Sequence, residues 1–505
     1  MHVSLLISII MYILNKISYN NYYKNSIITI ILIFYLFLTG CTASILRTTI
    51  MTITSLINKT LNLKIKKLDI MLITLVIAII INPFIIYEVG FQFSYIISLY
   101  LNILPKTITK LRSKLIKNLY TSLICFIVSF PICIYYFYQI NLLSIFLNLI
   151  MIPFVSIIIF PLSIINFIFP VIHDLYKLLI NILETINSLS SNLTLLTLKF
   201  TKPHIVIIII YYLIITISIY KPKCFIILII TIMIHKLYPY INNDYLITTI
   251  DVGQGDSILM SFPNNKLNIL IDTGGITTYN DEKWTKRKKE YSIIESKTIP
   301  YLKSIGITKL DYLIITHGDY DHMGEAINLV ENFKVEKVIF NCGEFNELEQ
   351  DLIKVLDKKK IPYNSCIKEL NIDNNKLYFL NSGDYGNEND NSSVIYTELN
   401  NYKFLFMGDT GLEVEKDLIK KYNLQNIDIL KVGHHGSKTS SSKEFIDEIN
   451  PKYSIISVGK NNGYGHPNKE VLNTLEDSKI YRTDQDGSIM FKIKNSKFKI
   501  ETCSP

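Results

Sequence analysis

The sequence has little cysteine and, through its first half, little charge. Seven cysteines occur among 505 residues, and they show no paired spacing of the kind that marks a metal knuckle or a disulfide-rich module. The spacing therefore predicts neither a disulfide framework nor a thiolate zinc site. These cysteines are Cys41, Cys125, Cys133 and Cys224 within apolar segments, and Cys342, Cys366 and Cys503 scattered through the remainder.

Charge is confined to short clusters between residues 1 and about 242, where Ile, Leu, Phe and Tyr dominate. Several apolar runs there approach or reach the ~20 residues that cross a ~30 Å hydrocarbon layer. They are too many for a signal peptide, and the first stretch lacks a cleavage-site pattern. We therefore expect residues 1–242 to form a multi-spanning membrane domain. The runs are 27–40, 70–87, 119–138, 142–169, 205–219 and 224–234.

The net charge of +8 carries a weaker signal. Basic residues cluster at 59–67 and 106–117, which is typical of cytoplasmic loops of membrane proteins and less so of a nucleic-acid patch. Arg47, just after an apolar run, indicates either a polar pathway or a side chain that reaches the interface. Segment 176–199 reads as a poor span or as an amphipathic surface helix. That segment decides which face the C-terminal half occupies, and we expect the extracytoplasmic face.

Residues 243–505 have the charge density and turns of a soluble domain. Strand and helix patterns alternate through this half, so we expect an α/β domain in which helices cover sheets. The predicted strands are 246–252, 257–262, 267–271, 312–316, 335–341, 377–380, 393–398, 404–407, 427–432 and 453–458. The predicted helices are 292–304, 323–333, 347–358, 411–421, 443–449 and 469–476.

Five of the loops that follow predicted strands carry acidic residues or histidine. A lone Asp in such a place often caps a helix, a lone Gly often only turns the chain, and a polar loop is often just solvated. Repetition of the pattern makes that explanation improbable. The loops are Asp251-Val252-Gly253-Gln254-Gly255-Asp256, Asp272-Thr273-Gly274-Gly275, Thr316-His317-Gly318-Asp319-Tyr320-Asp321-His322, Gly408-Asp409, and Gly433-His434-His435-Gly436-Ser437.

These motifs together resemble the metallo-β-lactamase-fold domain fused to ComEC-type competence proteins. Asn391-Ser392-Ser393, Tyr464-Gly465-His466-Pro467 and the segment from Tyr481 to Gly487 match its other motifs. In the first half, Ser44-Ile45-Leu46-Arg47-Thr48 and Gly90-Phe91-Gln92-Phe93-Ser94 resemble the competence domain. The resemblance implies an αββα fold for residues 243–505. Family members usually carry an N-terminal extracytoplasmic domain, which we expect this chain to lack.

His317 and Asp319 lie two residues apart and Asp321 and His322 are adjacent, so one loop can direct a pair at each of two ions. We expect Asp409 to bridge the ions and His435 to complete the ligand set. His434 would contact phosphate or protonate the leaving group, although a hydrogen-bonded core histidine is the alternative. Other candidates for supporting or substrate-binding roles are Asp272, Asp256, Asn391, Ser437, Lys438 and His466.

Carboxylate-rich ligands favour Mn²⁺ or Mg²⁺, with Zn²⁺ as a third possibility. The resemblance implies uptake of single-stranded DNA across the cell membrane, contact with lipid and other competence proteins, and a two-metal phosphodiesterase or nuclease domain. Two alternatives remain open: a channel with an inactive C-terminal domain, and a membrane-tethered hydrolase of small phosphodiesters. Lys431, Lys438, Lys443 and Lys469 could guide a polyanion, or could simply form a solvated basic face.

Overall fold

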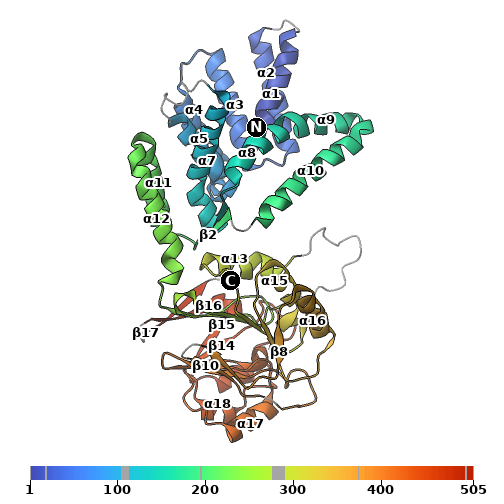
Figure 1. Ribbon diagram of the computed structural model, residues 1–505, viewed down its shortest axis with the longest axis vertical. Helices are drawn as coiled ribbons and strands as arrows, with labels where there is room; N and C mark the ends of the chain where they lie inside the picture. Colours follow the sequence, from blue (N-terminus) through green and yellow to red (C-terminus); the bar gives the residue numbers. More distant parts are fainter. Residues whose placement is uncertain are drawn as a thin grey trace. The chain divides into compact units, whose positions relative to one another are not determined.

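The protein is described by a computed structural model, shown in Figure 1, in which the chain forms two compact units. The first unit is Met1–Lys236 and the second is Leu237–Pro505. The domain boundary predicted at residue 242 stays a prediction. The structure describes residues 2–16, 20–103, 113–193, 196–275, 291–372, 375–381, 383–494 and 497–503. The second basic cluster, 106–117, therefore lies partly outside the described residues.

The first unit is helical, and each of the six predicted apolar runs falls on a helix. Helices α8 and α9 are joined through a π-helical stretch, Phe154–Ile159, so the chain is helical from Ser144 to Ile168. The helices are α1 His2–Lys16, α2 Asn21–Leu38, α3 Ala43–Thr60, α4 Lys67–Ile81, α5 Val89–Ile103, α7 Lys114–Tyr136, α8 Ser144–Pro153, α9 Phe160–Ile168, α10 His173–Asn192, α11 Ile205–Tyr220 and α12 Phe225–Leu237.

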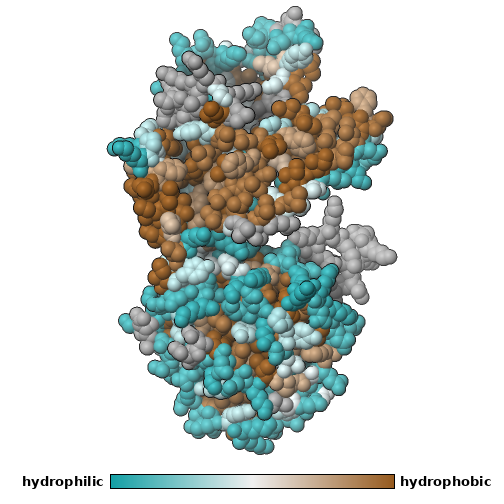
Figure 2. Space-filling model, viewed as in Figure 1, coloured by the Kyte–Doolittle hydropathy of each residue, from teal (hydrophilic) through white to brown (hydrophobic). Residues whose placement is uncertain are grey.

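Apolar side chains cover much of the outside of the first unit, which Figure 2 shows in brown against the mostly teal second unit. Four helical stretches of the described chain are long and apolar enough to cross a membrane, namely Asn21–Leu38, Ile116–Tyr136, Ser144–Ile168 and Pro222–Tyr240. Soluble proteins rarely expose so much contiguous apolar surface, so this surface is suited to contact with lipid. Helix α10, which holds most of the ambiguous segment 176–199, is not among these four.

Arg47 lies between helices of the first unit. Its Nη1 donates to Ser98 Oγ of α5 at 2.8 Å, and its guanidinium stands 5.6 Å from the Tyr95 ring. Both partners belong to the neighbouring helix, so the side chain is directed into helix packing. This geometry disfavours the interpretation that Arg47 reaches the membrane interface.

The second unit contains two mixed sheets. The first sheet has the order β17-β16-β3-β4-β5-β6-β7-β8 and the second has the order β15-β14-β13-β12-β11-β10-β9. Strands β5 to β8 pair in parallel, as do β12 to β15. The strands are β3 Tyr245–Thr249, β4 Ile258–Ser261, β5 Asn268–Ile271, β6 Tyr312–Ile314, β7 Val338–Phe340, β8 Tyr363–Ser365, β9 Glu369–Ile372, β10 Asn375–Phe379, β11 Ile395–Leu399, β12 Tyr402–Phe406, β13 Ile429–Lys431, β14 Tyr453–Ile456, β15 Lys479–Arg482, β16 Ser488–Lys494 and β17 Lys497–Cys503.

Alternate residues of each central strand enter different hydrophobic cores. Ile269 and Ile271 pack into the core between the sheets, whereas Leu270 packs under helices on the outer face. Both faces of β5 are therefore buried, which explains its unbroken apolar sequence. The helices over the first sheet are α13 Ile299–Ser304, α15 Ala326–Asn332 and α16 Glu347–Lys359, and those over the second are α17 Leu412–Lys421, α18 Lys443–Ile449 and α19 Lys469–Thr474. The αββα architecture is confirmed.

All six predicted helices of this unit and all ten predicted strands are present, with shifted ends. The strands β8, β9, β15, β16 and β17 were not predicted. Every residue of strand β8 is exposed, so its sequence carries no apolar pattern from which a strand could be predicted. Strand β16 does alternate buried and partly buried residues, and that period of two was a usable signal.

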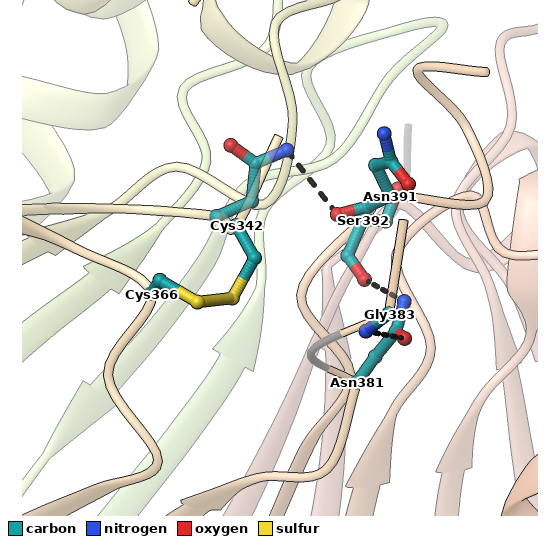
Figure 3. Close-up of a disulfide and its surroundings, with 7 residues drawn as sticks. Cys342, Cys366, Asn381, Gly383, Asn391 and Ser392 are labelled. Atoms are coloured by element: carbon teal, nitrogen blue, oxygen red, sulfur yellow. Dashed lines mark hydrogen bonds between the residues drawn. A yellow bond between two sulfur atoms is a disulfide. The ribbon is translucent and has the colours of Figure 1, made fainter. Parts of the chain in front are cut away.

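Cys342 and Cys366 form a disulfide, which the cysteine spacing did not predict (Figure 3). They lie just beyond the ends of β7 and β8, which are parallel neighbours joined through α16. That crossover brings residues 24 positions apart in the sequence to a Cα–Cα distance of 4.2 Å. The bond ties together two loops at the end of the sheet, and the pairing follows from strand order, which spacing alone does not show.

Candidate metal centre

The functional side chains gather where the central strands of both sheets end. The loops after β3, β5 and β6 leave the first sheet, and those after β12 and β13 leave the second. Close backbone approach is needed to bring them together. A Cβ on Gly255, whose φ is +121°, would lie 2.0 Å from the Asp321 carbonyl oxygen. Any larger residue at position 255 would therefore push the first loop away from the third.

Four side chains converge on one point, with ligand atoms all within 4.8 Å of one another: Asp321, His322, Asp409 and His435. The Nε2 atoms of His322 and His435 are 3.4 Å apart. Asp409 places Oδ1 3.1 Å from His322 Nε2 and Oδ2 3.4 Å from His435 Nε2. Asp321 Oδ2 is 3.2 Å from His435 Nε2. We refer to these four residues as the His–Asp cluster.

Hydrogen bonds on the far side of both imidazoles fix how they face the cluster. His435 Nδ1 is 2.9 Å from the Ser457 carbonyl oxygen, which can only accept, so Nδ1 carries a proton. His322 Nδ1 is 2.8 Å from Asp272 Oδ2, which also receives the Thr316 hydroxyl. With protons on both Nδ1 atoms, neutral imidazoles present Nε2 lone pairs to the cluster. This orientation suits metal ligation.

His317 and Asp319 lie beside the cluster. The His317 imidazole is fully buried, and its ring centroid is 4.1 Å from that of His322. His317 Nε2 is 3.6 Å from Asp319 Oδ2, while the Asp319 side chain is 45% exposed. These two residues could supply ligands for a second ion beside the cluster.

The cluster satisfies a direct test of fitness for metal. Among the described residues, His317 Nε2 and Asp409 Oδ1 are buried side-chain atoms without a hydrogen-bond partner. Unpaired buried polar atoms are costly, so these two atoms suit the binding of a cation. The electrostatics agree: burial alone would lower the pKa of His435, but the carboxylates of Asp409 and Asp321 raise it to about 10. The site demands positive charge, and a divalent ion would supply it.

His434 occupies the mouth of the site. Its side chain is 27% exposed, and its Nε2 lies 4.0 Å from Asp409 Oδ2. Its Nδ1 faces the Thr439 hydroxyl at 3.2 Å. His434 and His435 both have left-handed backbones, with φ of 48° and 53°. Such a conformation costs of order 1–3 kcal/mol per non-glycine residue and clusters at functional sites. In this conformation the His434 imidazole faces solvent and the His435 imidazole faces the cluster.

Lys431 is buried beneath the cluster, which corrects the expectation that it could guide a polyanion. Its Nζ is 2.7 Å from Asp256 Oδ2, and neither side chain is more than 3% exposed. Asp256 Oδ1 in turn lies 3.7 Å from His435 Nδ1. A buried lysine paired with a carboxylate compensates charge within the site and cannot reach a substrate in solvent.

The remaining predicted residues are less directly placed. Asn391 turns its side chain away, accepting from the Tyr385 backbone, and its neighbour Ser392 contacts the site instead by accepting from the Asp409 backbone N–H at 3.2 Å. Figure 3 shows the Asn391 and Ser392 loop beside the disulfide. Ser437 is buried and bonded to Thr439, whereas Lys438 is exposed. The His466 ring lies 6.0 Å from that of His434, at the mouth.

Sequence reasoning missed Thr316, Ser392 and Ser457, which position the ligands by hydrogen bonds. Thr316 lies within the predicted loop, one residue before His317, and its hydroxyl and backbone both bond to Asp272. Ser392 lies within the Asn391-Ser392-Ser393 motif, of which only Asn391 was predicted to support the site. Ser457 acts through its carbonyl oxygen, so its residue type carried no signal.

Comparison with known proteins now gives these two units an identity. Residues 1–223 match the Competence protein family, and residues 250–460 match the Metallo-beta-lactamase superfamily. The chain joins a competence protein domain to a metallo-β-lactamase domain. The two matches fall in the helical unit and in the αββα unit respectively.

The curated relatives of this chain come from several bacteria. It is 28% identical to ComE operon protein 3 of Bacillus subtilis over 98% of this chain and 67% of that protein. It is 29% identical to competence protein ComA of Neisseria gonorrhoeae, over 49% of this chain and 32% of that one. Recombination protein 2 of Haemophilus influenzae is 28% identical over 50% of this chain and 30% of its own. The chain thus spans about two thirds of one relative and about a third of the others.

The two domain matches indicate the coarse character of the protein. The competence domain and its apolar helices indicate a membrane protein. The metallo-β-lactamase fold, with a His–Asp cluster that fits metal, indicates a metal-dependent hydrolase that binds divalent ions.

The two adjacent histidines should behave differently on substitution. His435→Ala should lower the number of Mn²⁺ ions retained per chain, because it removes an Nε2 from the cluster. His434→Ala should leave metal content intact, since its Nε2 is 4.0 Å from the nearest carboxylate. Metal analysis after loading and desalting measures both, with Lys443→Ala on the exposed surface as control. The reverse pattern would exchange the two roles, and no effect from either would contradict the ligand assignment.

Proposed function

We propose that this chain is an integral-membrane DNA-uptake protein whose second unit hydrolyses nucleic-acid phosphodiesters with two divalent ions. Its partners would be DNA, membrane lipid and other proteins of the competence machinery. The observation that carries the proposal is the convergence of Asp321, His322, Asp409 and His435 at one buried point. The completeness of this set argues against a channel with an inactive C-terminal unit, because a site without function would tolerate loss of a ligand.

The ligand chemistry favours Mn²⁺ or Mg²⁺ over Zn²⁺ as the working ion. Asp319, Asp321 and Asp409 bring three carboxylates to the proposed ligand set, and carboxylate oxygen suits harder ions than imidazole does. When bound, two such ions would stabilise charge on a phosphoryl group and activate water for attack. The residues of this chain would bind these ions and orient the substrate.

Two residues of this chain would contribute directly to hydrolysis, one by holding ions and one by contacting the substrate. Asp409, with one oxygen toward each histidine of the cluster, would help to hold the ions that activate the substrate. His434, partly exposed at the mouth, would contact phosphate or give a proton to the leaving oxygen. The Thr439 hydroxyl at its Nδ1 orients the ring for either role.

Hydrolysis of a labelled oligonucleotide by the full chain in detergent, with Mn²⁺, tests the enzymatic proposal. Asp321→Ala and Asp409→Ala should each abolish hydrolysis, because losing a carboxylate leaves the ions poorly compensated. His434→Ala should slow turnover by roughly 10²–10⁴-fold, the range for loss of a general acid. Absence of hydrolysis by the native protein with Mn²⁺, Mg²⁺ and Zn²⁺ would refute the enzyme and leave DNA transport untouched. A Michaelis constant that does not change with salt would favour a small phosphodiester instead.

We further propose that the second unit lies on the extracytoplasmic face. The Cys342–Cys366 bond supports this placement, because structural disulfides persist in oxidising compartments and are rare in the cytosol. The opposite placement would expose the bond to cytosolic reductants. The bond lies beside the Asn391 and Ser392 loop (Figure 3).

Labelling of Cys503, a free and exposed thiol on β17, measures the orientation. Replacing Cys41, Cys125, Cys133 and Cys224 by serine leaves it as the single thiol outside the disulfide. A membrane-impermeant maleimide should label Cys503 in intact cells, and Cys342 and Cys366 only after reduction. A further Cys503→Ser change is the matched control. Labelling of Cys503 only after permeabilisation would place this unit in the cytoplasm.

A further inference from the structure

An exposed aromatic side chain stands on the loop that follows β14, at the mouth of the metal centre. Tyr464 is 68% exposed, which makes it the most exposed large hydrophobic side chain among the described residues of the second unit. Its ring lies nearly parallel to that of His466, at 11° and with centroids 6.0 Å apart. A single exposed tyrosine is ordinary by itself. The surroundings of this one are not.

The loop that carries Tyr464 is held in shape by a buttressing asparagine. The Asn462 side chain accepts from the backbone N–H of Tyr464 at 3.2 Å and of His466 at 3.1 Å. The same side chain donates to the carbonyl oxygens of Gly459 and His466. The tyrosine is therefore presented on an ordered turn, which reduces the entropy lost when a ligand binds to it.

The same loop is joined to the loops of the metal centre. The Gly459 backbone N–H donates to Gln254 Oε1, which belongs to the loop after β3. A Cβ on Gly436, directly after the two histidines, would lie 2.7 Å from Pro467. The position of Tyr464 is thus fixed relative to the His–Asp cluster.

A series of rings leads from the cluster outward. His434 lies 4.0 Å from Asp409, and its ring centroid is 6.0 Å from that of His466. The ring centroid of Tyr464 lies 6.0 Å from that of His466. The loop from Gly459 to Asn468 contains the exposed Lys460 and no acidic residue, and α19 begins with the exposed Lys469 and Glu470. Exposed lysines and an open aromatic ring therefore lie on the segment that adjoins the proposed phosphodiester site.

Single-stranded nucleic acid matches this surface. Its bases are unstacked and find aromatic side chains as stacking partners, while its phosphates favour lysine. A small phosphodiester has no ring to place on Tyr464, and paired bases in a duplex are already stacked. We propose that Tyr464, whose ring lies nearly parallel to that of His466, binds a nucleobase next to the scissile phosphate. This proposal rests on the proposed phosphodiesterase function and narrows its substrate to single strands.

Binding and hydrolysis by the full chain in detergent separate this proposal from the one on which it rests. Affinity for a fluorescent single-stranded oligonucleotide is measured by anisotropy in EDTA, where no turnover occurs. Tyr464→Ala should weaken binding roughly 5- to 150-fold, the loss of one stacked base, whereas Tyr464→Phe keeps the ring and should bind almost as the native protein does. Tyr378→Ala, which removes an exposed tyrosine from β10, is the matched control.

With Mn²⁺, the Michaelis constant for the oligonucleotide should rise in Tyr464→Ala relative to that for glycerophosphocholine, a phosphodiester without an aromatic ring, while Tyr464→Phe restores the native ratio. Equal affinities of the native protein and Tyr464→Ala, or a loss no larger than in Tyr378→Ala, would overturn the stacking role. Tyr464-dependent binding without any hydrolysis would support the stacking role and refute the enzyme.

Discussion

Two buried imidazoles that face each other across 3.4 Å are the feature on which the metal centre depends. Their Nδ1 atoms bond to Ser457 and Asp272, so their Nε2 atoms face each other and the carboxylates of the cluster. The carboxylates of Asp321 and Asp409 close the same space. A buried group of this kind is stable only when positive charge neutralises it. The structure therefore implies its ligand through its own hydrogen bonds.

The fold supplies this arrangement by ending parallel strands of two sheets at one edge of the unit. Glycines let the loops approach within backbone contact, and the left-handed pair His434 and His435 directs successive side chains to opposite sides. One histidine lies in the buried cluster and the other lies at the mouth, where His466 and Tyr464 continue the aromatic surface. Lys431 and Asp256 beneath the cluster add a buried pair that takes no part in binding substrate. The loop of His434 and His435 thus contributes one side chain to the buried cluster and one to the exposed mouth of the site.

The sequence predicted most of this site because strand ends combine a strong pattern with unusual residue types. Apolar runs that end in Asp or His predicted which loops would meet and an α/β domain with covered sheets, whereas the αββα layers were implied by the family resemblance. The burial of Lys431 was not predictable, because its partner Asp256 lies 175 positions away on the other sheet. Ser457 contributes only a carbonyl oxygen, and strand β8 is exposed, so neither leaves a side-chain pattern. The disulfide depends on β7 and β8 being neighbours, which is a property of strand order.

Electron paramagnetic resonance of the Mn²⁺-loaded full chain tests the central claim most directly, because it reports both the number of ions and their separation. The account predicts about two ions per chain with the exchange-coupled spectrum of a close pair, as expected for ions ~3.5–4 Å apart that share a carboxylate. A spectrum of isolated Mn²⁺ at about one ion per chain or fewer would contradict a two-ion centre bridged by Asp409.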